Sequence, residues 1–263
     1  MSAGWYSFER TAGLVIGGLD MACWDAVGKH VKQPVYKLMG GAVRKEFDSM
    51  YFVPGSNDIS EMTAKAKEAV GRGFRTIYYK VGIEEERDVE LVLKTREVIG
   101  NGPRLRVDAN EIWSPSTASR ILSRMRPANF ECVEQPVLMH DIAGLAHVRR
   151  HSGVPVAANQ ASWGRHAILE IIWREAADVV MTDPPREGGL LALQGYPDYL
   201  ADDYVTRPVD YSGGKMRLGD APGLGFEIDR TKVKAFHQAF LKEGHATAYA
   251  SAKAGAIATI PRD

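Results

Sequence analysis

One pattern decides the fold, a short β-rich run that ends in a polar or charged residue: TIYYK (76–80), LRVD (105–108), FECVE (130–134), VPVAAN (154–159) and DVVMTD (178–183). The last residues of these runs lie 28, 26, 25 and 24 positions apart. Amphipathic stretches fill the intervals, at 84–99, 116–125, 142–150 and 164–176. A strand and a helix that alternate at this period are typical of βαβ units in a parallel sheet.

The number of predicted βα units rises to six, because a strand at 48–53 and a helix at 59–72 precede these runs. In a (β/α)₈ barrel the C-terminal strand ends surround a single mouth, whereas in a doubly wound sheet they lie along one edge. No Gly-rich phosphate loop follows the first strand, which favours the barrel. After Gly188-Gly189 the chain is rich in turn formers, and no seventh or eighth unit is recognisable. We therefore expect an α/β fold, a TIM-type barrel that is incomplete.

The segment before the first strand is predicted to be a helix over 12–31. Its apolar side chains spread over a wide face, which suggests burial between other elements. The two cysteines, Cys23 and Cys132, are too few and too far apart for a disulfide framework or a zinc cluster, and both are expected to be buried thiols. Three histidines are interpreted as a solvated helix face, namely His140, His147 and His151.

The composition is that of an ordinary globular protein. The 263 residues include 33 Lys and Arg against 33 Asp and Glu, so the formal net charge is zero. A balanced charge argues against wrapping nucleic acid or steering to a membrane, which both favour a basic surplus. No window approaches the roughly 18–20 apolar residues of a membrane helix, and the first ten residues do not resemble a secretory signal. We expect a cytoplasmic protein with no nucleic-acid or membrane partner.

The residues that end the strands form the candidate site. Asp108, Glu134 and Asn159 follow three consecutive strands, and their oxygens are ligands that hard cations such as Mg²⁺ prefer. Lys80 and Asp183 follow the flanking strands, where they could move a proton to or from a substrate held at the metal. Any one of these positions alone is explained by the polarity of loops. Five such residues, each at the end of a strand and spaced by one period, favour a metal site with acid–base groups.

Six motifs surround these residues: VDAN (107–110), VEQP (133–136), PVAANQ (155–160), GLDMACWD (18–25), PVYKLMGG (34–41) and APGLG (221–225). Together they resemble the enolase superfamily, and within it the mandelate racemase/muconate lactonizing enzyme group. The resemblance covers about residues 12–230. It implies a modified (β/α)₇β barrel with an α+β capping domain, and abstraction of the proton alpha to a carboxylate. Members of this superfamily use a Lys or His base with one or two Mg²⁺ ions.

The resemblance also implies a role for each strand-end residue. Asp108 and Glu134 match the first two Mg²⁺ ligands of the group. Lys80 matches the second lysine of its Lys-x-Lys motif, which is usually a general base. Asp183 falls where racemase-type members place an aspartate that partners a histidine on the next strand, so Lys80 and Asp183 are the predicted catalytic residues.

The sequence departs from the group's pattern in ways that affect the expected activity. Tyr78 replaces the first lysine of Lys-x-Lys, and Asn159 puts a neutral amide where an acidic ligand is usual, which weakens the expected affinity for Mg²⁺. Most of the capping domain, the last two strands and the histidine partner of Asp183 are not found. Because such a barrel admits water to its mouth, we expect this chain alone to bind Mg²⁺ weakly and to turn over carboxylates poorly.

The predicted function is Mg²⁺-dependent abstraction of the α proton of a small carboxylate substrate, a sugar acid or an amino-acid derivative. Dehydration, cycloisomerisation or racemisation would follow. The alternative is a catalytically inactive relative that serves as a scaffold or oligomer subunit. The predicted domains are 1–44, a capping-domain remnant with a connecting helix; 45–194, the barrel units; and 195–263, a segment that returns toward the cap region. An open sheet edge invites pairing with another chain, so a homo-oligomer is expected.

Overall fold

A curved parallel sheet forms the centre of the molecule, and the computed structural model describes residues 9–181, 194–195 and 204–243. Neighbouring strands follow the order β7-β6-β5-β4-β3-β2-β8, and every pair is parallel. The strands are β2 (Met50–Phe52), β3 (Thr76–Lys80), β4 (Arg104–Asp108), β5 (Cys132–Glu134), β6 (Val156–Ala158), β7 (Val179–Val180) and β8 (Gln194–Gly195). The strand β8, which pairs with β2, was not predicted.

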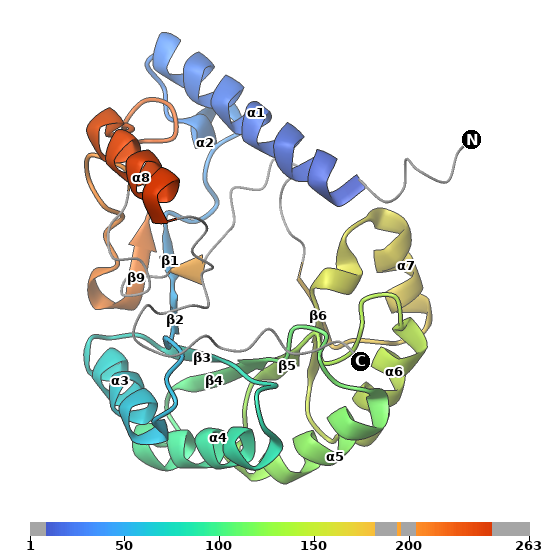
Figure 1. The fold of residues 1–263 in the computed structure, drawn as a ribbon. Helices are drawn as coiled ribbons and strands as arrows, with labels where there is room; N and C mark the ends of the chain where they lie inside the picture. Colours follow the sequence, from blue (N-terminus) through green and yellow to red (C-terminus); the bar gives the residue numbers. More distant parts are fainter. Residues whose placement is uncertain (1–8, 182–193, 196–203, 244–263) are drawn as a thin grey trace.

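Helices cover the outer face of this sheet, one after each strand from β2 to β6 (Figure 1). They are α3 (Ile59–Gly71), α4 (Glu85–Ile99), α5 (Pro115–Met125), α6 (Ile142–His151) and α7 (Arg165–Trp173). Side chains at three N-caps, Asp58, Ser114 and Asp141, accept hydrogen bonds from backbone N–H groups of the first turn and so define where α3, α5 and α6 begin. The predicted strand–helix alternation is confirmed.

The hydrophobic core lies between the strands and these helices. Along β3, Ile77 and Tyr79 point to the helical layer and belong to the core, together with Leu105 and Val107 of β4. The Tyr79 hydroxyl donates to the main-chain oxygen of Met62 on α3 at 3.1 Å. Because side chains alternate along a strand, the residues between these, including Tyr78 and Lys80, point to the inner side of the curved sheet.

A second group of elements lies across the sheet from α4 and α5 (Figure 1). It contains α1 (Glu9–His30), α2 (Val35–Leu38), β1 (Glu46–Asp48), β9 (Lys215–Arg217) and α8 (Arg230–Glu243). The antiparallel pair of β1 with β9 and the helix α8 were not predicted. Short 3₁₀ turns lie at Arg126–Ala128, Gln160–Ser162 and Ser212–Gly214.

Hydrogen bonds and close backbone contact join the helix α1 to the C-terminal part of the chain. Oδ1 of Asp25 accepts from the backbone N–H of Leu224 at 2.8 Å, and the N–H of Gly223 donates to the carbonyl of Gln33 at 3.0 Å. Gly28 lies against Gly223 so closely that a Cβ on Gly28 would be 2.7 Å from the Gly223 Cα. A glycine is required at this crossing because no side chain fits.

Two sequence predictions about α1 are wrong. Its apolar face was expected to be buried, yet Val15, Ile16 and Leu19 are 59%, 62% and 64% exposed. The contacts that join α1 to the segment around Gly223 lie at Asp25 and Gly28 instead. Cys23, on the same helix, is exposed, whereas Cys132 on β5 is buried as predicted, and burial raises its pKa to about 11.

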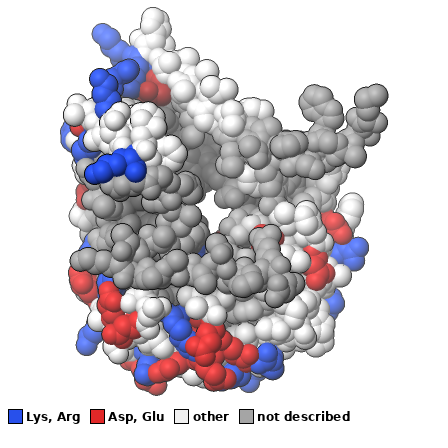
Figure 2. Space-filling model, in the orientation of Figure 1, with Lys and Arg blue, Asp and Glu red and all other residues white. Residues whose placement is uncertain are grey.

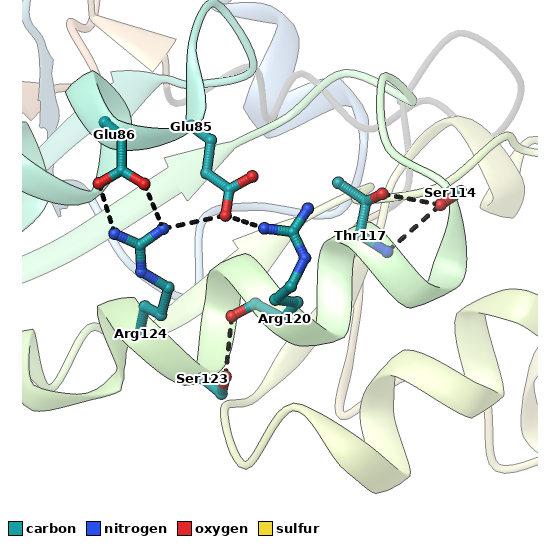
Figure 3. A network of polar contacts seen from close by, with 7 residues as sticks. All are labelled: Glu85, Glu86, Ser114, Thr117, Arg120, Ser123 and Arg124. Carbon is teal, nitrogen blue, oxygen red and sulfur yellow. Dashed lines mark hydrogen bonds and ion pairs between the residues drawn. The ribbon is translucent and has the colours of Figure 1, made fainter.

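Charged side chains of both signs are interspersed on the surface over the outer helices (Figure 2). Between α4 and α5, Arg124 makes a two-pronged ion pair with Glu86 at 2.6 and 2.8 Å, and Glu85 bridges Arg124 and Arg120 (Figure 3). These arginines lower the pKa of both glutamates. No helix in the described part of the chain is long and apolar enough to cross a membrane.

Candidate active site

Four of the five predicted site residues lie side by side at the C-terminal ends of adjacent strands. Lys80 is the register partner of Asp108, and Asp108 is the register partner of Glu134. Glu134 in turn pairs with Ala157 of β6, and Asn159 follows the end of that strand. Their side chains therefore meet at one end of the sheet, which is where barrel enzymes carry out their chemistry. The fifth, Asp183, lies outside the described residues.

Lys80, Tyr78 and Asp108 form a connected polar group. Nζ of Lys80 contacts Oδ2 of Asp108 and lies 3.1 Å from the Tyr78 hydroxyl. The same hydroxyl donates to Oδ2 of Asp108 at 2.6 Å, and the Tyr78 ring lies 5.3 Å from Nζ. The other oxygen of Asp108 accepts from the backbone N–H of Asn110 at 2.7 Å. The buried phenol thus holds the amino group and the carboxylate in fixed relative positions.

Glu134 and Asn159 form the second half of the site. Nδ2 of Asn159 donates to Oε1 of Glu134 at 2.6 Å. Burial, and after it the negative charge of Asp108, raises the pKa of Glu134 to about 7, although the amide of Asn159 and the charge of Lys80 oppose the shift. Oε2 of Glu134 and Oδ1 of Asn159 are buried without a hydrogen-bond partner among the described residues. Two oxygens are therefore left available for a ligand.

Gln135 positions Asn159 relative to Glu134. This fully buried side chain accepts from the backbone N–H groups of Asn159 and Ala161 at 3.0 and 2.9 Å, and donates to the carbonyl of Val137 at 2.9 Å. Its φ of 36° turns the chain sharply after β5. The two hydrogen bonds from Asn159 and Ala161 tie the loop after β5 to the loop after β6, and the third, to Val137, anchors the side chain within its own loop, so the spacing of the two candidate ligands is held by one amide.

The donor set fits a hard divalent cation. Asp108 and Glu134 are both 1% exposed, and with the amide oxygen of Asn159 they offer only oxygen ligands. Within the described ranges, no three His, Cys, Asp or Glu side chains are grouped to share a metal, and the Asn159 amide oxygen beside Glu134 is the candidate for the third protein ligand. The unpartnered Oε2 and Oδ1 are the expected state of ligand atoms, and carboxylate with amide oxygen suits Mg²⁺.

Sequence reasoning missed the roles of Tyr78 and Gln135. Tyr78 was noted only as the residue that replaces a lysine, whereas its hydroxyl joins Lys80 to Asp108. Gln135 is part of the motif VEQP (133–136), but its partners lie 24 and 26 positions further on. A polar residue placed directly after a buried strand was the one available signal.

Comparison with known proteins identifies relatives with three different reactions. The family described as Enolase C-terminal domain-like matches residues 61–195. The N-succinyl-L-Arg/Lys racemase of Bacillus cereus is 34% identical over 229 residues, which cover 86% of this chain and 58% of the racemase. The arabinonate dehydratase of Saccharolobus solfataricus is 30% identical over 258 residues, which cover 81% of this chain and 69% of the dehydratase.

The fold agrees with a solved structure. Muconate cycloisomerase from Pseudomonas fluorescens superposes with a TM-score of 0.76 at 22% identity, over 85% of this chain and 74% of that one. The chain spans less than two thirds of the length of the racemase. The family match, the similarity to a racemase and a dehydratase, and the shared barrel agree with the motifs around the strand ends. The chain belongs to the mandelate racemase/muconate lactonizing enzyme group of the enolase superfamily, and its fold is the TIM-type α/β barrel of that superfamily.

Proposed function

We propose that the protein catalyses Mg²⁺-dependent abstraction of the α proton of a small carboxylate substrate. One observation carries the proposal: Lys80 lies against Asp108, beside the Glu134–Asn159 pair, whose buried Oε2 and Oδ1 have no hydrogen-bond partner in the described part of the chain. An amino group next to an oxygen-only ligand set is the combination that this reaction needs, because the proton must leave a carbon whose neighbouring carboxylate gains negative charge.

Asp108, Glu134 and Asn159 are the residues that would hold Mg²⁺. When bound, the ion supplies positive charge where negative charge develops on the substrate carboxylate. The two carboxylates balance the charge of the cation, and the neutral Asn159 amide makes the set weaker than three carboxylates would be. Gln135 keeps Asn159 in place through hydrogen bonds to the backbone N–H groups of Asn159 and Ala161.

Lys80 is the proposed general base. Its amino group would take the α proton, and its position is set by the Tyr78 hydroxyl and by Asp108. A phenol at this position brings a neutral donor and acceptor to the substrate carboxylate in place of a cation. Asp183 is proposed as a second catalytic residue. If Asp183 has no histidine partner, Lys80 is the single base, and dehydration or cycloisomerisation then suits the site better than racemisation does.

The proposed substrates are sugar acids and amino-acid derivatives. The relatives whose names specify a substrate include a racemase of N-succinyl-L-Arg/Lys and an arabinonate dehydratase, and both names denote small carboxylates. We also propose a homo-oligomer, because the end of a parallel sheet presents unpaired backbone groups. The division at residues 44 and 194 into a cap remnant, barrel units and a returning segment stays a proposal.

The test is a screen for exchange of the α proton in D₂O. N-succinyl amino acids and sugar acids are incubated with the protein and Mg²⁺, and deuterium at the α carbon is measured by NMR and mass spectrometry. The proposal predicts incorporation for at least one of the two classes that stops when EDTA removes the metal. Exchange that is equal with Mg²⁺ and with EDTA, or no exchange with any member of either class, would contradict it.

A further inference from the structure

Two histidines on α6 lie outside the strand-end site and form a pair. His147 and His151 are four positions apart, which places them on the same face of the helix. Both side chains are exposed, and their rings stack with centroids 4.2 Å apart and planes 24° apart. Because α6 ends just before β6 begins, the pair lies at the opposite end of that strand from Asn159.

A hydrogen bond fixes the tautomer of one ring. Nδ1 of His151 lies 2.8 Å from the main-chain oxygen of His147. A carbonyl oxygen can only accept, so Nδ1 of His151 must carry the proton, and the lone pair is left on Nε2. Histidines that bind metals are oriented in the same way, with one ring N–H donated to a backbone carbonyl and the other nitrogen facing the ion.

The surroundings of the two histidines favour a bound cation, although two arginines lie nearby. Both histidines lie in the last two turns of α6, where the helix dipole stabilises positive charge. The adjacent Arg149 is held by Asp178 at 2.8 Å and by the carbonyl of Glu175 at 3.1 Å. Arg150 is exposed, so solvent and salt screen its charge.

We propose that His147 and His151 chelate a borderline divalent transition-metal ion, at a site distinct from the strand-end carboxylates. Two imidazole nitrogens select Cu²⁺, Ni²⁺ and Zn²⁺ over Mg²⁺, and the affinity is highest for Cu²⁺. With the His151 ring held by its hydrogen bond, rotation of the exposed His147 ring out of the stack would bring a ring nitrogen of His147 to the ion at Nε2 of His151, the i, i+4 arrangement with which one helix face binds a metal. Water completes the coordination, since within the described ranges no three His, Cys, Asp or Glu side chains gather around a metal.

The test is a titration of the full chain with Cu²⁺ in excess Mg²⁺, which occupies the carboxylate site. Binding is followed by calorimetry and by electron paramagnetic resonance, where two coordinated imidazoles give a characteristic nitrogen splitting. The variants are His147→Ala and His151→Ala, and the matched control is His140→Ala, an exposed histidine outside the pair. Circular dichroism checks that each variant is folded.

The site of highest affinity is expected to bind one Cu²⁺ per chain, and the electron paramagnetic resonance spectrum is expected to show two coordinated nitrogens. Each variant of the pair is expected to lose at least about tenfold in affinity and one coordinated nitrogen, because removal of a group that supports a ligand already costs 10- to 100-fold. His140→Ala should bind as the unaltered chain does. Equal titrations for His147→Ala, His151→Ala and His140→Ala, or a tightest ion without imidazole splitting, would overturn the proposal.

Discussion

Nδ2 of Asn159 donates a hydrogen bond to Oε1 of Glu134 across the ends of β6 and β5, at 2.6 Å. The amide does what a carboxylate at this position could not do, since it is neutral and supplies a donor to a buried acid. The remaining oxygens of the pair, Oδ1 and Oε2, are buried and have no hydrogen-bond partner among the described residues. Compared with a third carboxylate, the neutral amide lowers the negative charge that has to be buried at these strand ends, where at most Asp108 and Glu134 are ionised.

Asn159→Asp is therefore expected to lower the stability of the protein without metal and to raise its affinity for Mg²⁺. Without metal, the new carboxylate lies next to Glu134, so we expect a lower melting temperature in EDTA. With Mg²⁺, a third negative ligand should tighten binding by roughly tenfold, because ligand charge tunes the affinity of such sites. Thermal unfolding against Mg²⁺ concentration measures both effects, with Asn159→Ala as the variant expected to weaken binding. A tenfold loss in Asn159→Asp would show that residue 159 does not face the metal.

The raised pKa of Glu134 predicts how stability depends on pH. Its pKa moves from 4.5 to about 7 on folding, so between these values the native state keeps a proton that the unfolded state has lost. Stability contributed by this group is complete below pH 4.5 and is lost as the pH rises through 7. In EDTA, the advantage of Glu134→Gln over the unaltered chain should grow across this window by at most about 3 kcal/mol.

Urea unfolding at several pH values measures this advantage. Added Mg²⁺ should reverse the trend for the unaltered chain, stabilising it more at pH 8 than at pH 6, because the ion binds the ionised carboxylate. An advantage of Glu134→Gln that is the same at pH 5 and pH 8 would be inconsistent with a buried, proton-retaining Glu134.

Gln135→Met should destabilise the protein by roughly 2–6 kcal/mol. Two buried N–H groups, those of Asn159 and Ala161, would lose their acceptor, and each unsatisfied group costs about 1–3 kcal/mol. Urea unfolding gives the free energy, and Gln238→Met on the exposed surface of α8 is the control, expected to change it by less than about 0.5 kcal/mol. Equal effects of the two substitutions would mean that Gln135 does not hold the loops together.

Two glycines of α1 provide a matched pair of variants that tests the contact between α1 and the segment 223–224. A Cβ at Gly28 would lie 2.7 Å from the Gly223 Cα and 2.9 Å from the Gln33 oxygen, whereas a Cβ at Gly18 would meet nothing within 4 Å. Gly28→Ala should cost about 1–3 kcal/mol because the backbone has to shift, and Gly18→Ala should gain up to about 1 kcal/mol of helix propensity. Thermal unfolding that ranks the two variants in the reverse order would contradict this contact.

Local patterns predicted the parallel part of the fold well. The helices expected at 59–72, 84–99, 116–125 and 142–150 appear as α3, α4, α5 and α6 with ends that differ by at most one residue. Caps such as Ser114 and periodic apolar residues mark these elements within a few positions of the chain. The strand ends that carry Lys80, Asp108 and Glu134 follow from the same period, because parallel strands end at one edge.

Contacts between residues far apart in the sequence could not be predicted from local patterns. The strand predicted at 48–53 divides at Ser49, and β1 pairs with β9, about 170 positions away, through three residues on each side. No local pattern marks so short a partner in a stretch rich in turn formers. The link from Tyr78 to Asp108 and the links made by Gln135 likewise depend on which strands become neighbours, so they emerge only from the assembled sheet.

The central claim, that Lys80 removes an α proton, is tested most directly by deuterium exchange of a responsive carboxylate with Lys80→Met in saturating Mg²⁺. Lys94→Met is the matched control, since Lys94 lies on the surface of α4 paired with Glu90. The account predicts slow but Mg²⁺-dependent exchange by the unaltered chain, the same rate in Lys94→Met, and no exchange above the buffer rate in Lys80→Met, with Mg²⁺ still bound. Exchange in Lys80→Met at the rate of the unaltered chain would contradict it.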